Sequence, residues 1–208
     1  MLDFGDLTIL LGASFFAGFI NSIVGSGTLI TFPTLLVLGI NPIVANASNN
    51  LGLVPGAISA AIATRKDFQN FANRRFLKNL IISAALGSII GSFLLLVTSV
   101  EFLRILIPIL IIIALVALWS NKIFKNPKEK TQMSKLNLMI AAGLGTYGGY
   151  FGAAQGIMWI SYLQSFKTFS IYSANAIKNL IAGIVNTSAS IIFLIFGKID
   201  WQLTICIG

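Results

Sequence analysis

The sequence predicts an all-α membrane protein, a polytopic helix bundle built from two internal repeats that each contain a Gly-rich interrupted helix. Of its 208 residues, 56% are hydrophobic and 10% are charged, whereas a soluble domain carries roughly 25% charged residues. Residues 7–64 carry no charge at all, and each crossing of a bilayer needs about 20 apolar residues. The short alternating segments of a membrane β-barrel do not occur in the sequence.

The first element is predicted over residues 7–38, with an interruption near 23–28. The interruption contains Gly25-Ser26-Gly27-Thr28, and Pro33 follows; glycine and proline both weaken the helical hydrogen-bond ladder. Within a bilayer, freed backbone groups are tolerated only where protein buries them or water lines a cavity. The stretch is therefore a candidate ion or substrate site. Close helix packing through small residues is the alternative reading.

The remaining elements follow from apolar length and from turn signals. The uncharged 7–64 segment is longer than two crossings, so it predicts two spans plus a broken or re-entrant piece. Gly87 and Gly91 lie one turn apart and predict a helix-packing face. Pro108 is expected in the first turn of the fourth span, where its missing N–H is harmless. After the 7–38 element, helices are expected over 43–64, 80–100, 105–119, 136–166 and 171–196, with a final stretch from Trp201.

Two sequence matches predict an internal repeat. Residues 45–51 match 174–180 at five of seven positions, and 18–25 aligns with 145–152 at an offset two residues shorter. Tandem halves with Gly-interrupted segments at corresponding positions indicate a transporter's binding site. The predicted organisation is a first repeat at 1–121, a basic cytoplasmic linker at 122–136, and a second repeat at 137–208 that looks incomplete at its end. Parallel and inverted orientations of the halves both remain open.

The net charge of +8 predicts orientation rather than nucleic-acid binding. Ten of the fourteen Lys and Arg residues lie in two short segments, 65–78 and 122–135. Short loops rich in Lys and Arg mark the cytoplasmic side of a membrane, so both segments are expected there. A patch that binds anionic lipid is the alternative. The acidic start of the chain does not resemble a cleavable signal peptide.

The chemistry-bearing residue types argue against an enzyme and against a bound metal or cofactor. The sequence has no His and a single cysteine, Cys206, which removes the commonest general base and the commonest metal ligands. A Ser26–Lys178 catalytic dyad is the remaining enzymatic alternative. The predicted membrane interiors lack Asp and Glu, which makes a proton relay on an internal carboxylate an unfavourable hypothesis.

The motifs resemble a known family of membrane proteins. GFINSIVGSGTLITFPTLL, ANASNNLGLVPG, YGGYFGAAQGIMWI, ANAIKNLIAGIVN and GKIDW occur in that order and are similar to the two halves of the TauE/SafE (TSUP) sulfite-exporter family. The resemblance implies about seven to nine helices in the plasma membrane of a prokaryote. It also implies transport of small anions, often sulfur-containing ones such as sulfite or sulfoacetate. Family members usually continue through another helix or two beyond the position of Gly208.

Lys178 is the most informative candidate site residue. It lies one to two turns into a predicted membrane helix, where a charged side chain is costly and indicates function by default. The alternative is that its side chain extends to the membrane interface. An anion site also needs neutral donors, namely amides, hydroxyls and exposed backbone N–H groups. The predicted substrate-binding set is Asn21, Ser22, Gly25, Ser26, Gly27, Thr28, Asn46, Asn49, Asn50, Gly152, Gln155, Asn175, Lys178 and Asn179.

Each neutral candidate also has a structural alternative. The repeat-related Asn50 and Asn179 could bond across helices as packing contacts. Asn46 and Asn175 could cap helix starts, and Ser26 and Thr28 could bond back to their own helix. The expected function is transport of a small anion by alternating access at the repeat interface, within the lipid bilayer. A non-transporting membrane subunit or assembly factor is the second hypothesis, and a homo-oligomeric state is left open.

Overall fold

The computed structural model describes residues 3–69, 74–119 and 134–208, and those residues form helices and connecting turns without any β-strand. The predicted all-α class is therefore confirmed. Most of the predicted basic linker at 122–136 lies outside the described residues. The helices are α1 Phe4–Val24, α2 Thr28–Val37, α3 Pro42–Ala63, α4 Lys66–Gln69, α5 Arg74–Val97, α6 Val100–Trp119, α7 Lys135–Tyr150, α8 Gln155–Gln164, α9 Ile171–Phe196 and α10 Trp201–Ile207.

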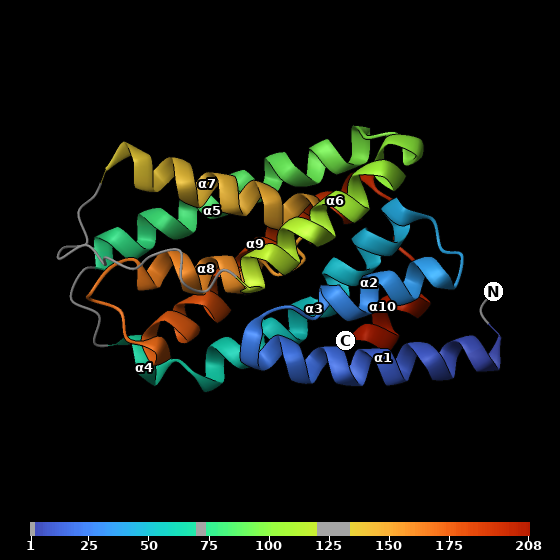
Figure 1. Cartoon of the computed structure of the whole chain (residues 1–208), viewed down its shortest axis with the longest axis horizontal. Helices are drawn as coiled ribbons and strands as arrows, with labels where there is room; N and C mark the ends of the chain where they lie inside the picture. Colours follow the sequence, from blue (N-terminus) through green and yellow to red (C-terminus); the bar gives the residue numbers. More distant parts are fainter. Residues whose placement is uncertain (1–2, 70–73, 120–133) are drawn as a thin grey trace.

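The interrupted element of the first half is a hairpin. α1 begins at an Asp3–Asp6 capping box and ends at Gly25, which adopts the left-handed conformation (φ +72°). α2 then returns toward the end of the bundle where α1 began (Figure 1). The left-handed region suits glycine because it has no Cβ. The predicted interruption near 23–28 is thus a sharp reversal over 25–27.

A second hairpin enters from the opposite end of the bundle. α7 ends just before Phe151, α8 begins at Gln155, and Gly152 between them is again left-handed (φ +74°). Figure 1 shows α1 and α7 running in opposite directions, so that the two hairpin turns point toward the middle from opposite ends. In each hairpin, the short second helix turns back toward the end from which the first helix entered.

Glycines allow α5 and α7 to pack with their backbones in direct contact. A Cβ added at Gly87 would overlap the Ala142 carbonyl oxygen, and one added at Gly91 would overlap that of Thr146. From the other side, a Cβ at Gly145 would overlap the Ala84 oxygen, and one at Gly149 that of Ser88. The packing face predicted from the Gly87–Gly91 spacing is confirmed, and α7 supplies the matching glycines.

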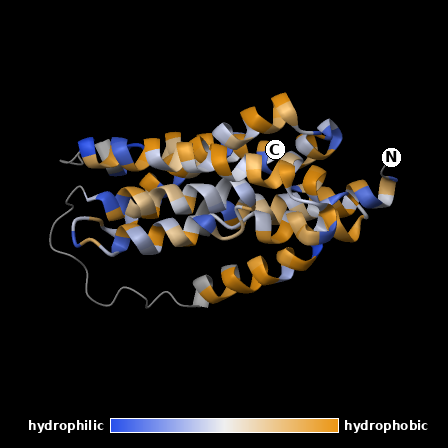
Figure 2. Ribbon diagram, turned by 90° about the horizontal axis from the view of Figure 1, so that it is seen from above, coloured by the Kyte–Doolittle hydropathy of each residue, from blue (hydrophilic) through white to orange (hydrophobic). Residues whose placement is uncertain are grey.

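The surface fits a lipid environment. Three described helices are long and apolar enough to cross a membrane, at Phe4–Asn21, Arg74–Val97 and Ile171–Phe196. On α1, the large side chains of Phe15, Phe16 and Phe19 are exposed, and α6 carries a similar row of exposed isoleucines. Figure 2 shows hydrophobic residues along most helix surfaces and strongly hydrophilic ones mainly toward the ends of the bundle.

Two predicted helix starts differ from the structure. α5 begins at Arg74 rather than Leu80, because basic residues are tolerated in the terminal turn of a membrane helix that reaches water. α6 begins at Val100 rather than Ile105, with Glu101 in its first turn, where a carboxylate favours the helix N-terminus. Pro108 consequently lies inside α6 rather than in its first turn.

Candidate functional site

The turns of the two hairpins meet at Gly25 and Gly156. The Gly156 N–H donates a hydrogen bond to the Gly25 carbonyl oxygen at 3.2 Å, across 131 residues of sequence. A Cβ at Gly25 would lie 2.8 Å from the Gly156 Cα, closer than real Cβ contacts allow. Gly25 therefore combines a left-handed backbone with a close approach of two chains, and both features require glycine.

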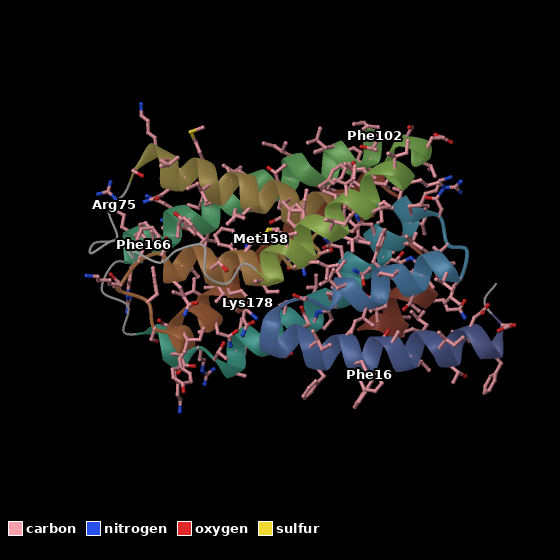
Figure 3. The ribbon with its side chains drawn as sticks, viewed as in Figure 1. Phe16, Arg75, Phe102, Met158, Phe166 and Lys178 are labelled. Carbon is pink, nitrogen blue, oxygen red and sulfur yellow. The ribbon has the colours of Figure 1, made fainter. Side chains whose placement is uncertain are left out.

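Lys178 lies at this meeting point. It comes from α9, its exposed fraction is 1%, and its Nζ has no hydrogen-bond partner among the described residues. Its Nζ lies 3.3 Å from the position of a Cβ on Gly25, and Figure 3 shows the residue in the interior near the α1–α2 turn. The alternative that Lys178 extends to the membrane interface is wrong, because its amino group is buried.

Ser26 adds a second unpaired group beside the same turn. It is 3% exposed, and its Oγ has no hydrogen-bond partner in the described part of the chain. The alternative that the Ser26 hydroxyl bonds back to its own helix is therefore wrong. Because Ser26 follows Gly25 directly, a buried hydroxyl donor and a buried ammonium donor flank one glycine.

The two return helices begin without side-chain caps. Helices α1, α3, α7, α9 and α10 each start at a residue whose side chain accepts a hydrogen bond from the first turn. At the starts of α2 and α8, the cap residues Gly27 and Ala154 provide no such side-chain bond. Backbone carbonyls satisfy most of these first N–H groups instead: those of Leu29 and Ile30 bond to Ser26 and Gly27, and those of Gln155 and Gly156 bond to Gly152 and Gly25.

Several candidate residues at the first hairpin are paired within the protein. The Asn49 amide nitrogen donates to Thr28 Oγ1 at 3.3 Å, and its amide oxygen accepts from Thr31 Oγ1. Asn21 Oδ1 accepts a long bond from the Gly27 N–H, at 3.4 Å. Asn49 thus fastens α2 to α3, and Asn21 holds the turn. The Ser22 side chain lies outside the described part of the structure.

Asn46 fastens the second hairpin. Its Nδ2 donates to the Tyr150 carbonyl oxygen at 2.7 Å, at the end of α7. It does not cap α3, because Asn41 does so by accepting from the Ile43 N–H. Likewise Ser170, rather than Asn175, caps α9. The capping alternatives for Asn46 and Asn175 are therefore wrong, and the Asn175 amide oxygen is buried without a partner among the described residues.

The other repeat-related asparagines form long cross-helix contacts. Asn50 Oδ1 accepts from Ser190 Oγ at 3.4 Å, and Asn179 Nδ2 donates to Thr64 Oγ1 at the same distance. Near the second turn, Gln155 Nε2 donates to Asn186 Oδ1 at 3.0 Å, while Gln155 Oε1 is buried and unpaired within the described chain. These contacts join α3 to α9 and α8 to α9 around the meeting point.

Three residues at the site were not among the sequence candidates. Thr31 binds Asn49, Asn186 binds Gln155, and Gly156 supplies the bond between the turns. Asn186 lies about two helical turns beyond Lys178, directly after the apolar run 180–185, and that amide was the available signal. Thr31 and Gly156 gave no signal beyond belonging to the two interrupted segments.

The arrangement suits an anion better than a metal ion. The described residues contain no group of three or more His, Cys, Asp or Glu side chains that could hold a metal. None of their carboxylates is buried, whereas Lys178 is. A buried ammonium and a buried hydroxyl without partners offer donors to a negatively charged group in a medium of low dielectric constant, where such bonds are strong.

Comparison with known proteins identifies relatives along almost the whole chain. The family described as "Sulfite exporter TauE/SafE" matches residues 10–208. A "Probable membrane transporter protein YfcA" of Escherichia coli (strain K12) is 32% identical over 200 residues, which cover 93% of this chain and 73% of the relative. A "Probable membrane transporter protein" of Haemophilus influenzae is 30% identical over 199 residues, covering 95% and 77%.

A more distant relative agrees with these two. The "Probable membrane transporter protein ORF9" of Sinorhizobium sp is 27% identical over 212 residues, covering the whole of this chain and 79% of its own length. No solved structure matches the chain. The resemblance read from the paired motifs is confirmed: the chain belongs to the TauE/SafE family of membrane transporters.

Proposed function

We propose that the chain is a secondary transporter of small anions and that the anion binds where the two hairpin turns meet. The observation that carries the proposal is the buried Lys178 amino group, which has no partner among the described residues and lies beside Gly25. An intramembrane charge without a protein partner is costly and marks an ion or substrate pathway. Ser26 supplies a neutral hydroxyl donor at the same place.

The proposed substrates are sulfur-containing anions such as sulfite, sulfoacetate or similar organosulfonates. The support is the family's description as sulfite exporters together with the donor-rich site. Anions of this type present several oxygen acceptors, which match an ammonium and a hydroxyl. Transport in this proposal uses no ATP-binding loop, since the sequence contains no Walker A motif.

The proposed mechanism is alternating access between two inverted repeats. Its support is the correspondence between the halves: α2 and α8 each have 10 residues, and Gly25 and Gly152 occupy aligned positions with φ of +72° and +74°. α3 and α9 begin at aligned positions as well. Hairpins that enter from opposite ends and meet at one point suit a site reached from either side by rocking of one half.

In this proposal the basic end of the bundle faces the cytoplasm of a prokaryote. Arg65, Arg75 and Lys135 lie at the end where α3 finishes and α5 and α7 begin (Figures 1 and 3). Asp3, Glu101 and Asp200 lie at helix starts toward the other end. Short basic segments are retained on the cytoplasmic side of membranes, and the named relatives come from bacteria.

The experiment that tests the proposal is uptake of radiolabelled sulfite into proteoliposomes that contain the full chain. The uptake rate of the Lys178→Gln variant is expected to be at least tenfold lower than that of the wild type. The uptake rate of Lys198→Gln, which removes an exposed lysine, is expected to be unchanged. Both variants are first checked for unchanged helix content by circular dichroism. Unchanged uptake in a folded Lys178→Gln variant would show that the anion does not bind at this lysine.

The alternative functions give different results in the same system. A folded wild-type chain that moves no anion but copurifies with another membrane protein would support a non-transporting subunit. Covalent labelling of Ser26 by a serine-reactive probe would support the dyad of an intramembrane enzyme, an activity that this proposal does not include.

A further inference from the structure

The substrate's charge can be inferred from the charges that surround the site. Lys178 is the one Lys or Arg in the described residues that is buried, and none of the described Asp or Glu side chains is. Asp3 and Asp200 cap helix starts at the bundle end, away from Lys178. The described interior therefore holds one positive charge and no negative one.

The first half of the chain has no charged residue at the position that corresponds to Lys178. The position aligned with Lys178 in the first half is Asn49, a neutral amide. Both of its polar atoms bond to threonines of α2, which holds this amide in a contact between helices. The two halves are alike in backbone, but only the second carries a charge at this position.

We propose that the site between the hairpin turns accepts a substrate with a single negative charge and discriminates against dianions. This inference rests on the proposed function. A monoanion beside a protonated Lys178 forms a neutral complex in a medium of low dielectric constant. A dianion would leave one negative charge without a partner, and an uncompensated buried charge is strongly unfavourable.

The neutral donor at the site does not offset a second charge. Ser26 Oγ can donate one hydrogen bond, but a hydroxyl is a dipole without net charge. The site therefore favours sulfite in its singly protonated form and simple alkanesulfonates over sulfoacetate with both acids ionised, which narrows the set of substrates in the proposed function.

The test compares three anions with the same sulfonate group. Methanesulfonate and sulfoacetamide carry one charge, and sulfoacetate carries two; sulfoacetamide matches sulfoacetate in size. Each competes at neutral pH with radiolabelled sulfite for uptake by proteoliposomes of the full chain, and each is also tested for thermal stabilisation of the purified protein. Both monoanions are expected to compete at concentrations at least tenfold lower than sulfoacetate and to give the larger thermal shift.

Variants at Lys178 separate charge from shape. Lys178→Arg keeps the charge and should preserve the ranking of the three anions, whereas Lys178→Gln, in which uptake is already lost, should abolish the thermal stabilisation by all of them. Equal competition by sulfoacetate and sulfoacetamide would overturn the charge inference and leave transport in place. Absence of both uptake and thermal stabilisation in the folded wild-type chain would overturn the proposed function itself, and the charge inference with it.

Discussion

The two hairpins have the same backbone plan but are anchored in different ways. The second hairpin is held by groups from several elements. Asn46 on α3 donates to the Tyr150 carbonyl oxygen, and Tyr147 Oη donates to the Ala153 carbonyl oxygen at 2.6 Å. Glycines also let the backbones of α7 and α5 pack in direct contact. The first hairpin keeps Ser26 Oγ unpaired beside the unpaired Lys178.

The two halves therefore have similar backbones but differ in how their side chains are paired. The second hairpin is tied to α3 and α5, and its buried unpaired atoms are Gln155 Oε1, Trp159 Nε1 and Tyr162 Oη. The first hairpin places one unpaired hydroxyl donor, Ser26 Oγ, at the meeting point. A polar group left unpaired in the interior is unfavourable, and native proteins keep such groups mainly where a ligand completes them. Two pairs of aligned positions, and one further position in the second turn, allow the comparison to be tested.

The largest effect is expected at Gly145, which aligns with Gly18 of the first hairpin. Gly145→Ala would drive a Cβ into the Ala84 carbonyl and force α7 away from α5, at a cost of about 3 kcal/mol or more from overpacking. A Cβ at Gly18 meets nothing within 4 Å, so Gly18→Ala should change stability by less than about 1 kcal/mol, in the stabilising direction. Thermal unfolding in detergent measures both; equal melting temperatures would contradict the unequal anchoring.

An intermediate effect is expected at the left-handed glycines of the turns. Gly25→Ala adds the cost of a left-handed alanine, about 1–2 kcal/mol, to a clash with the Gly156 Cα, for a total of about 2–3 kcal/mol. Gly152→Ala meets only the Gly148 carbonyl, at 3.0 Å for its oxygen, and should lose about 1–2 kcal/mol. Sulfite uptake should fall more in Gly25→Ala. A larger loss in Gly152→Ala would place the sensitive turn in the second hairpin.

The smallest effect is expected at Ala154, which is the described non-glycine residue with positive φ, at +57°. Ala154→Gly relieves a strain of about 1 kcal/mol and loses the burial of one methyl group, about 0.8 kcal/mol. The net change in the free energy of unfolding should lie within about 1 kcal/mol, measured by the same thermal unfolding. A loss well above that range would mean that the Ala154 methyl packs more tightly than its strain suggests.

Much of the fold could be predicted from sequence because apolar length and turn residues dominate in a membrane. The predicted helix over 171–196 agrees with α9, and the break at Gly25-Ser26-Gly27 follows from glycine chemistry. The sequence alone could not distinguish a reversal of direction at that break from a continuous span, because the direction of α2 depends on the helices that pack around it. The start of α6 was missed because Glu101 and Arg104 look like loop residues until the helix dipole is considered.

The site could be predicted less completely. Lys178 was identified because a lysine in an apolar helix is conspicuous, but the partners of the asparagines depend on contacts between distant segments. Asn46 to Tyr150 spans 104 residues and Asn50 to Ser190 spans 140, and one sequence holds no signal for such pairs. The sequence-predicted candidates remain proposals as substrate ligands, although several of them lie close to the meeting point.

The bond between Gly25 and Gly156 also has a consequence for biosynthesis. At a synthesis rate of about 5–20 residues per second, the first turn waits roughly 7–26 s for its partner to be made. During that interval it depends on nearby residues, and its contacts are indeed local: Asn21 to Gly27, and Asn49 to Thr28 and Thr31. The second hairpin emerges when α3 and α5 already exist, so it can be held by elements made earlier. The order of synthesis thus accounts for which hairpin is self-supporting and which is braced by the rest of the chain.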